Sequence, residues 1–276
     1  MTDKYCVIGN PIAHSKSPEI HAAFARETGQ DIAYERRLAP LDGFADTVRA
    51  LVAQGYRGAN VTVPFKLEAA AIATRLEERA RLAGAVNTLR FDGIEIVGDN
   101  TDGAGLVADI VRNAGVALAG RRVLLLGAGG AARGVVLPFL QQGPAAIVIA
   151  NRTRATADAL AAQFAGHAAP GQVVACGFED IAGSGAPFDV VVNATSASLS
   201  AAMPPVPAAA FCQGTLALDM MYGKLPSPFM AFAARHGAAT RDGLGMLVEQ
   251  AAEAFFGWRG VRPATSAVLE RMRSTL

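Results

Sequence analysis

The sequence has few cysteines, no long apolar run and almost no excess of charge. Its 276 residues contain three cysteines and one tryptophan, and the formal net charge is only +1. A net charge so close to zero, with no run of like charges, argues against a nucleic-acid-binding or polybasic membrane-binding surface. No uninterrupted apolar stretch approaches the roughly 18 residues that a membrane-spanning helix needs. We therefore expect no nucleic-acid partner and no membrane attachment.

The cysteine content also argues against a disulfide framework and against a thiolate metal site. Cys6, Cys176 and Cys212 are widely separated and odd in number, and the four histidines add no metal-ligand spacing. The N-terminus leads directly into a strand-like segment at residues 6–8, without the basic region and apolar stretch of a secretory signal. These features predict buried free thiols, no bound metal and a cytoplasmic location.

The alternation of segment types predicts an α/β fold. Hydrophobic residues make up 51% of the chain and charged residues 18%, which is enough for a sizeable core. Short β-branched runs alternate with longer segments rich in alanine and leucine, a pattern typical of βαβ units and mainly parallel sheets. A length of 276 residues is comfortable for two domains.

The expected elements form two series on either side of residue 102. In the first series we predict helices over 18–28, 41–54 and 65–80, and strands over 4–9, 32–38, 58–63, 85–90 and 94–98. Phe91-Asp92-Gly93 between two apolar runs predicts a hairpin. In the second series we predict helices over 102–114, 130–141, 154–165, 245–257 and 264–274, and strands over 122–126, 146–150, 171–175, 189–192, 216–219 and 238–241.

A glycine-rich turn stands between an expected strand and an expected helix of the second series. The spacing G-x-G-x-x-A is fitted by Gly127, Ala128, Gly129, Gly130, Ala131 and Ala132. The first glycine permits a tight turn, the second lets the backbone approach a pyrophosphate, and the third position must be small for close packing. The helix N-terminus then offers free N–H groups to the phosphates. The placement predicts a dinucleotide-binding loop, whereas the glycine spacing alone would also fit an ordinary turn.

The end of the next strand indicates which dinucleotide is bound. Proteins that bind NAD usually carry Asp or Glu there for the ribose 2′-hydroxyl. This strand ends instead in Asn151, Arg152, Thr153 and Arg154, and two guanidiniums with a hydroxyl suit a 2′-phosphate. The alternative is an exposed basic turn with Thr153 as the helix N-cap, and the two can coexist. We therefore predict NADP(H) as the cofactor.

Three segments of the first series are unusually polar for strand ends. They are residues 10–18 with Ser15 and Ser17, residues 60–66 with Thr62 and Lys66, and Asn87-Thr88 together with residues 98–103. In an open α/β sheet, ligands bind outside the carboxyl ends of the strands. We therefore expect these side chains to converge on one crevice.

These segments resemble the signature blocks of the shikimate dehydrogenase family. The likeness continues over residues 127–133, 151–153, 193–196, 219–222 and 243–251. The blocks run in family order over nearly the whole chain, from about residue 5 to residue 264. The resemblance implies NADPH-dependent reduction of 3-dehydroshikimate to shikimate, a step of aromatic amino-acid biosynthesis. We expect a small-molecule substrate and a monomer or homodimer.

The resemblance also implies roles for individual residues. Ser15 and Ser17 would bind the substrate carboxylate. The ring hydroxyls would be bound by Thr62, Asn87, Asp102 and Gln250, with Tyr222 bordering the substrate. Lys66 and Asp102 would be the catalytic pair. Beyond the glycine-rich turn and the basic segment, the cofactor would contact Thr195, Ser196, Met220, Gly243 and Met246.

Several of these residues also have an ordinary structural interpretation. Ser17 before Pro18 could cap a helix, and Asp102 could cap the next one. Lys66 could be solvated and Gln250 could lie on a helix surface, while Tyr222 and Met246 could serve packing alone. The joint spacing of the residues, rather than any one of them, favours the functional interpretation.

Two other functions remain open. Members of the family that accept quinate often have Thr at the position of Ser17, and members that use NAD often have Asp at the position of Asn151, so both residues favour the biosynthetic enzyme. A non-catalytic NADP-sensing protein would have no need of the Lys66 and Asp102 pair. The chain departs from the family at Ala22, at Ala197-Ser198 and in the early position of Arg154. The phosphate contact of Arg154 therefore stays open.

The two series predict two α/β domains. Residues 1–102 plus 246–276 would form a mainly parallel substrate-binding catalytic domain, and residues 103–245 a Rossmann-type NADP-binding domain. The first domain is discontinuous because Gln250 belongs to the substrate site although it lies late in the chain. The C-terminal helices are therefore expected to return to the first domain.

Overall fold

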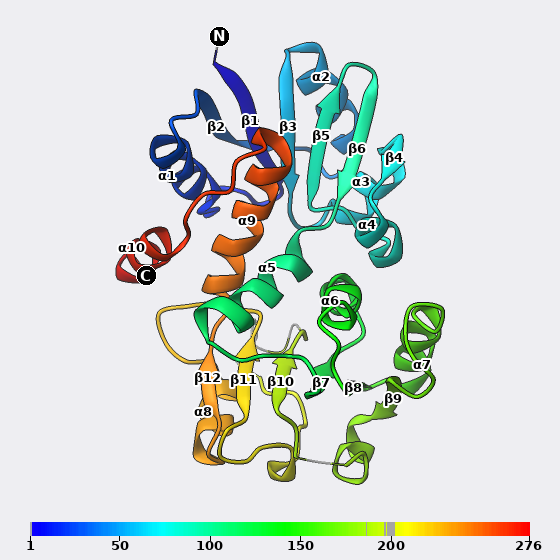
Figure 1. Ribbon diagram of the computed structural model, residues 1–276. Helices are drawn as coiled ribbons and strands as arrows, with labels where there is room; N and C mark the ends of the chain where they lie inside the picture. Colours follow the sequence, from blue (N-terminus) through cyan, green and yellow to red (C-terminus); the bar gives the residue numbers. More distant parts are fainter. Residues whose placement is uncertain (1, 186, 196, 198–201) are drawn as a thin grey trace. The chain divides into compact units, whose positions relative to one another are not determined.

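The computed structural model describes residues 2–185, 187–195, 197 and 202–276 (Figure 1). Contacts divide the chain into two compact units, Met1–Gly105 with Val248–Arg271, and Leu106–Leu247 with Met272–Leu276. Each unit contains a six-stranded sheet accompanied by helices. The predicted α/β class is confirmed.

The first sheet is mixed, with the strand order β2-β1-β3-β5-β6-β4. Its pairs are parallel between β1 and β2, β1 and β3, and β4 and β6, whereas β5 runs antiparallel to β3 and β6. The strands are β1 (Asp3–Gly9), β2 (Ile32–Leu38), β3 (Tyr56–Val61), β4 (Arg75–Leu76), β5 (Thr88–Asp92) and β6 (Glu95–Asp99). The helices before residue 100 are α1 (Ser17–Thr28), α2 (Phe44–Ala53), α3 (Lys66–Ile72) and α4 (Glu78–Ala83).

The predicted hairpin is confirmed, because β5 and β6 pair from Thr88 with Asp99 to Asp92 with Glu95. Gly93 turns the chain with a φ of 62°, a left-handed conformation that glycine adopts without a steric cost.

The prediction of one helix over residues 65–80 is wrong. The chain forms α3, then the short strand β4, and then α4. Thr74 explains the break, since its backbone N–H donates to the Ile96 carbonyl (2.8 Å) and its hydroxyl accepts from the Ile96 N–H (2.9 Å). Pairing of β4 with β6 therefore overrides the helical propensity of this alanine-rich stretch.

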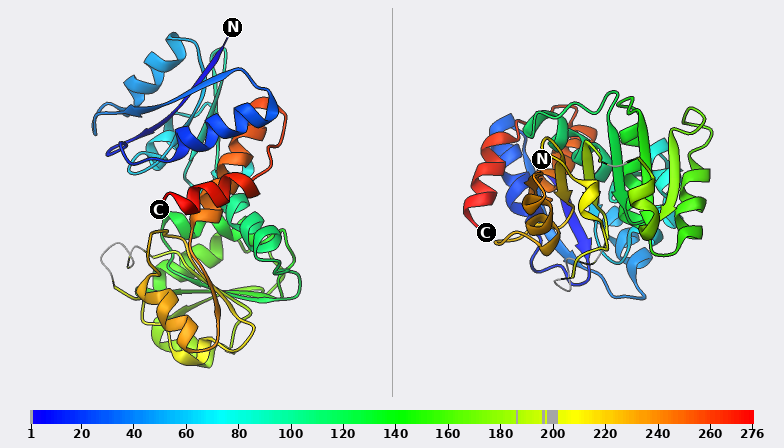
Figure 2. Two further views of the ribbon diagram at one scale, coloured as in Figure 1. Left: turned by 90° about the vertical axis from the view of Figure 1, so that its left-hand side faces the viewer. Right: turned by 90° about the horizontal axis from the view of Figure 1, so that it is seen from below.

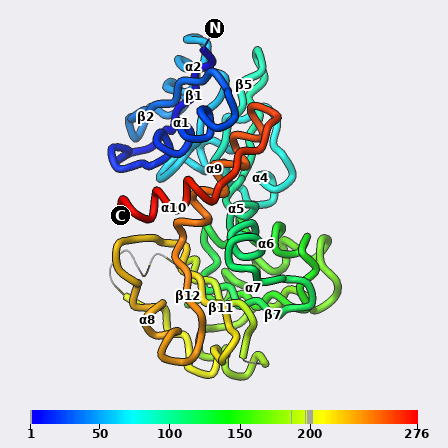
Figure 3. Tube along the Cα trace, turned by 60° about the vertical axis from the view of Figure 1, so that its left-hand side comes forward, coloured from blue at the N-terminus to red at the C-terminus, as the bar shows by residue number. Residues whose placement is uncertain are grey.

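The C-terminal half of α9 (Leu244–Arg259) packs on the first sheet, as Figures 1 and 3 both show. Trp258 stacks on Tyr5 with ring centroids 4.6 Å apart, and its indole N–H donates to the Leu89 carbonyl at 3.0 Å. An indole that buries its apolar face and satisfies its donor anchors a helix well. A segment late in the sequence thus belongs to the first unit.

The second sheet is entirely parallel, with the order β12-β11-β10-β7-β8-β9. Its strands are β7 (Arg122–Leu126), β8 (Ala146–Asn151), β9 (Val173–Gly177), β10 (Val190–Asn193), β11 (Leu216–Asp219) and β12 (Ala239–Arg241). Beyond residue 100, the helices that the structure describes besides α9 include α5 (Asp102–Ala108), α6 (Gly130–Leu140), α7 (Arg154–Gln163), α8 (Pro228–Arg235) and α10 (Ser266–Ser274), with the π-helix η1 (Asp109–Asn113) and the 3₁₀ segments η2 (Phe178–Gly183) and η4 (Ala208–Ala210). This strand order is that of a Rossmann sheet, and helical segments cover both of its faces (Figure 2).

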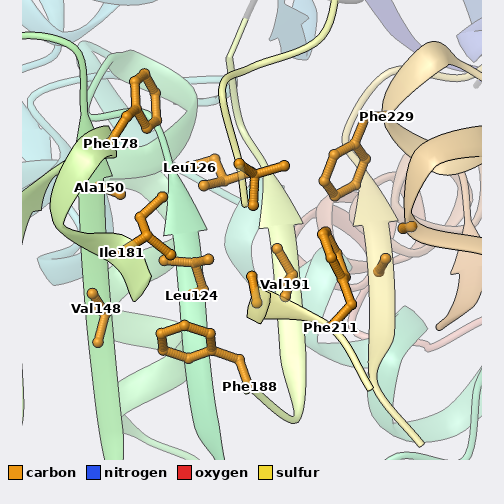
Figure 4. Packing of buried hydrophobic residues seen from close by; sticks show 14 of the residues in the cluster. Leu124, Leu126, Val148, Ala150, Phe178, Ile181, Phe188, Val191, Phe211 and Phe229 are labelled. Atoms are coloured by element: carbon orange, nitrogen blue, oxygen red, sulfur yellow. The ribbon is translucent and has the colours of Figure 1, made fainter. Parts of the chain in front are cut away.

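The continuous apolar runs of β7, β8 and β10 follow from burial on both faces, as expected of parallel strands between helices. Figure 4 shows one face of these strands, where Leu124, Val148 and Val191 belong to one buried cluster with Phe188 and Phe229. Loss of a buried phenylalanine side chain costs about 3–5 kcal/mol, so this cluster contributes strongly to folding. Polar residues stand instead at the carboxyl ends of these strands, where β8 ends at Asn151 and β10 at Asn193.

Candidate functional site

Lys66 and Asp102 form an ion pair in the first unit. Lys66 is the first residue of α3 and Asp102 the first residue of α5, and Lys66 Nζ lies 2.6 Å from Asp102 Oδ2. Their side chains are 33% and 14% exposed, so the pair is shielded but open to a ligand. Lys66 is therefore paired rather than simply solvated, and Asp102 is the first residue of α5 rather than the residue that caps it.

Asn87 fixes the second oxygen of Asp102 and connects it to α9. Its amide nitrogen lies 2.8 Å from Asp102 Oδ1, 3.0 Å from Thr101 Oγ1 and 3.3 Å from Gln250 Oε1. Its amide oxygen accepts from the Thr101 N–H (2.8 Å) and the Thr88 hydroxyl (2.9 Å). Asn87 and Gln250 are both buried, so Gln250 is not a surface residue. A buried amide with all its groups paired holds one orientation.

The hydrogen-bonded network extends to residues whose role is not indicated by the sequence. Asn60 donates to the Thr88 hydroxyl at 3.0 Å and accepts from the Tyr34 hydroxyl at 2.7 Å. His21 stacks on Tyr34 with ring centroids 4.2 Å apart, and burial lowers its pKa to about 3. Asn60 lies in one of the polar segments and could have been found there, whereas Tyr34 in the middle of β2 gives no such signal.

The segments after β1 and β3 bring Ser15, Ser17 and Thr62 to the same edge of the first sheet. β1 lies between β2 and β3, so the strand order reverses at β1. Open α/β sheets bind ligands at such a topological switch point. Ser15 Oγ accepts from the Ser17 N–H at 3.3 Å, and the N–H of Thr62 donates to the Ile8 carbonyl at 2.9 Å. Ser17 is the first residue of α1, and Lys16 occupies the N-cap position, so the interpretation of Ser17 as the helix N-cap is wrong.

The glycine-rich turn joins β7 to α6 with its backbone open at the helix N-terminus. Gly127 follows β7 directly with a φ of 104°, and α6 begins three residues later. A Cβ at Gly127 would lie 3.2 Å from the Ala194 carbonyl oxygen. Glycine is therefore favoured here both by the positive φ and by the close approach of the Ala194 backbone. Gly129, Gly130 and Ala131 are exposed at the helix N-terminus, while Ala128 and Ala132 are buried. The turn therefore presents open backbone at the positive end of a helix, which suits the phosphates of a dinucleotide.

The basic segment after β8 separates its two arginines. Arg154 lies 3.4 Å from Asp180 and 3.8 Å from Asp158, so its charge is partly engaged. Arg152 is exposed, and within the described part of the chain it makes no ion pair. Asn151 donates to the Thr153 carbonyl at 3.0 Å, and Thr153 occupies the N-cap position of α7 without a side-chain cap bond. Arg152 is thus better placed than Arg154 to receive a phosphate.

Two buried residues at strand ends hold the backbone at or next to the predicted cofactor residues Thr195 and Met220. Asn193, at the end of β10, accepts from the Thr195 N–H (3.1 Å) and hydroxyl (2.7 Å), and Asp219, at the end of β11, accepts from the Met221 N–H (3.0 Å). Gly243 lies so close to the backbone of Met220 that a Cβ at Gly243 would be 2.1 Å from the Met220 carbonyl oxygen. Met246 is buried and Tyr222 is 36% exposed, both in the second unit. Ser196 lies outside the described residues.

Among the residues that the structure describes, no helix is long and apolar enough to cross a membrane. The same residues contain no group of three or more His, Cys, Asp or Glu side chains that could hold a metal ion.

A Rossmann sheet with an open glycine-rich turn, together with a Lys–Asp pair in a separate unit, defines the class of dinucleotide-dependent oxidoreductases. Three family models match the chain: the shikimate dehydrogenase substrate binding domain over residues 7–89, shikimate/quinate 5-dehydrogenase over residues 109–202, and the shikimate 5′-dehydrogenase C-terminal domain over residues 243–273. The chain belongs to the shikimate dehydrogenase family.

Relatives match the chain over its whole length. The shikimate dehydrogenase (NADP(+)) of Herminiimonas arsenicoxydans is 61% identical over 276 residues, which cover 100% of this chain and 99% of that protein. The crystal structure of an Ael1 enzyme from Pseudomonas putida is 48% identical, with a TM-score of 0.93 and 98% of both chains covered. Shikimate 5-dehydrogenase from Thermus thermophilus, in complex with NADP(H) and shikimate, is 32% identical, with a TM-score of 0.86 and 100% of both chains covered.

Proposed function

We propose that this chain catalyses the reversible, NADPH-dependent reduction of 3-dehydroshikimate to shikimate, with Lys66 and Asp102 as the proton-transfer pair. The observation that carries the proposal is the 2.6 Å contact between Lys66 Nζ and Asp102 Oδ2, in a chain 61% identical to a shikimate dehydrogenase (NADP(+)). The reaction would serve the biosynthesis of aromatic amino acids.

Reduction of the ketone requires a hydride on carbon and a proton on oxygen. The bound cofactor supplies the hydride, and the side chains must orient the substrate and move the proton. Lys66 donates a proton from its ammonium to the carbonyl oxygen, and in the reverse direction its amine takes the proton from the hydroxyl. Asp102, held by Asn87 through its other oxygen, keeps the lysine and the reacting oxygen in line.

The remaining residues of the first unit would bind the substrate. Ser15 and Ser17 follow β1 and offer hydroxyls to the carboxylate, while Thr62, Asn87 and Gln250 offer hydrogen bonds to the ring hydroxyls. Tyr222 would border the substrate. The substrate domain would comprise residues 1–102 plus 246–276, and the NADP-binding domain residues 103–245.

The cofactor would be held by the second unit. The exposed backbone of Gly129, Gly130 and Ala131 suits the pyrophosphate, and Arg152 suits the 2′-phosphate because no carboxylate of the described residues pairs with it. Gly127, Ala128, Asn151, Thr153 and Arg154 would complete the site, together with Thr195, Ser196, Met220, Gly243 and Met246. The thiols of Cys6 and Cys176 are free and buried, whereas Cys212 is free but exposed, so the expectation of a buried thiol is wrong for Cys212. We further propose a cytoplasmic enzyme, which these free thiols fit, and a monomer or homodimer.

The test is an assay of cofactor reduction with shikimate or quinate as substrate and NADP⁺ or NAD⁺ as cofactor. We expect the highest kcat/KM with shikimate and NADP⁺, since Ser17 and Asn151 favour that pair. Comparable values with quinate would indicate a dehydrogenase of broader specificity. Binding of NADP⁺ without turnover of shikimate would contradict the proposal and favour a nucleotide sensor.

A further inference from the structure

Arg79, on α4 in the first unit, holds two carboxylates that belong to other elements. Its Nε and Nη2 donate to the two oxygens of Asp99 at 2.6 Å each, and its Nη1 donates to Glu253 Oε1 at 3.0 Å. The three side chains are 25%, 21% and 19% exposed. One guanidinium thus joins α4, the end of β6 and α9 through three charge-assisted bonds, two of them in a bidentate pair.

Asp99 connects Arg79 to the residue that pairs with Lys66. It lies three residues before Asp102, and its carboxylate also accepts from the Asn100 N–H at 2.7 Å. Asn100 Oδ1 in turn accepts from the Asp102 N–H at 3.2 Å. The position of the Asp99 carboxylate therefore fixes the turn on which Asp102 begins α5.

Glu253 connects Arg79 to the other side of the same site. It follows Gln250 by three residues on α9, so both side chains lie on one face of the helix. Gln250 Oε1 lies 3.3 Å from Asn87 Nδ2, and a Cβ at Gly105 would lie only 2.5 Å from the Gln250 nitrogen. The backbones of α5 and α9 are therefore in close contact at this point. A shift of α9 relative to α5 would move Gln250 away from Asn87.

The elements that Arg79 joins are not close-packed throughout. A cavity of about 220 Å³ is lined by Asp99, Glu253 and Trp258, so the space between β6 and α9 is only partly filled. Burial alone would raise the pKa of Glu253, but hydrogen bonds from Arg262 and Arg79 keep it below its usual value. The two arginines therefore compensate the cost of burying the charged carboxylate of Glu253.

We propose that Arg79 is a positioning residue for the reaction: by holding Asp99 and Glu253 together, it sets where Asp102 and Gln250 stand relative to Lys66 and the substrate. This proposal rests on the proposed function. Arg79 touches neither Lys66 nor Asp102, so it acts only through the turn after β6 and through α9.

The test compares Arg79→Gln, Arg79→Lys and Arg262→Gln in the full chain. Arg262 pairs with the same Glu253 but not with Asp99, which makes its variant a matched control. Because misplacement by about 1 Å can cost roughly 10²-fold in rate, we expect Arg79→Gln to lower kcat/KM for shikimate by about 10- to 100-fold. The KM for NADP⁺ should stay within about two-fold, since the cofactor residues lie in the second unit.

The rescue variant and the pH profile separate positioning from simple stabilisation. Arg79→Lys keeps the charge but loses the bidentate pair, so it should recover only part of kcat/KM and keep the wild-type pH profile. Arg262→Gln should stay close to wild type. If Arg79→Gln does not fold, Asp99→Asn replaces it, because this change keeps the shape of Asp99 and weakens its bonds to Arg79.

Two failures can be told apart. A wild-type chain that does not oxidise shikimate would refute the proposed function itself. An active wild type, with Arg79→Gln or Asp99→Asn variants that melt earlier but keep kcat and KM for shikimate, would overturn the positioning role alone. An equal loss in Arg262→Gln would also overturn it, because the effect would then come from α9 and not from Asp99.

Discussion

The amide of Asn87 donates to one oxygen of Asp102 at 2.8 Å and leaves the other oxygen to Lys66. The two oxygens of one carboxylate are therefore held by different partners, one neutral and buried and one charged and accessible. Such an arrangement fixes the plane of the carboxylate while Lys66 stays able to turn towards a ligand.

Replacement of Asn87 by alanine should impair the site without destroying the fold. The change removes a hydrogen bond to a charged group, worth about 1.5–3 kcal/mol, so kcat/KM for shikimate should fall by about 10- to 100-fold. Steady-state kinetics with a parallel melting curve measure this. A variant that keeps wild-type kcat/KM would show that Asp102 does not depend on Asn87.

Replacement of Arg152 by alanine should affect NADP⁺ far more than NAD⁺. The lost charge-assisted bonds to the 2′-phosphate should raise the KM for NADP⁺ by about 10-fold or more and leave the KM for NAD⁺ within about two-fold. Arg154→Ala is the matched control, since Arg154 is already engaged by Asp158 and Asp180. An equal rise for both cofactors in Arg152→Ala would argue that Arg152 does not recognise the 2′-phosphate.

Buried His21 should make folding stability depend on pH. Its pKa falls from about 6.5 in the unfolded chain to about 3 in the fold, because burial disfavours the charged ring. As the pH falls from about 7 to about 3, the unfolded state binds the proton first, so the free energy of unfolding decreases. The loss between about pH 7.5 and pH 5 amounts to about 2 kcal/mol.

The variant His21→Phe keeps a flat ring on Tyr34 but cannot titrate. Urea unfolding of both proteins at the two pH values should show this part of the pH dependence only in the wild type, whatever the absolute stability of the variant. The same pH dependence in both proteins would assign the acid sensitivity to other groups.

Elements with a strong local pattern could be predicted from the sequence, and those set by distant partners could not. The apolar runs of β7 and β8 and the Asp92-Gly93 turn are local signals, and the structure has them where expected. The single helix expected over residues 65–80 does not form, because Ile96, which is distant in the sequence, pairs with Thr74. Single-residue pairing of this kind leaves no periodic pattern.

The same division applies to the site. Lys66, Asn87 and Asp102 stand in polar segments at strand ends, so they could be named from the sequence. Tyr34 and Arg79 lie within ordinary elements, and only the fold brings Tyr34 to Asn60 and Arg79 to Asp99. The supporting residues of a site are therefore harder to predict than the residues that face the substrate.

The central claim is that Lys66 transfers the proton, and the variants Lys66→Ala and Lys66→Arg test it directly. Arginine keeps a positive charge beside Asp102 but cannot release a proton near neutral pH, so it separates proton transfer from simple charge pairing. Lys4→Ala, on the exposed side of β1, controls for loss of a lysine elsewhere.

The deciding measurement is kcat for shikimate oxidation by these variants with saturating NADP⁺. We predict a loss of about 10²- to 10⁴-fold in both Lys66 variants, a much smaller change in KM, and wild-type kcat in Lys4→Ala. A Lys66→Ala or Lys66→Arg variant that retains near-normal kcat would contradict the account.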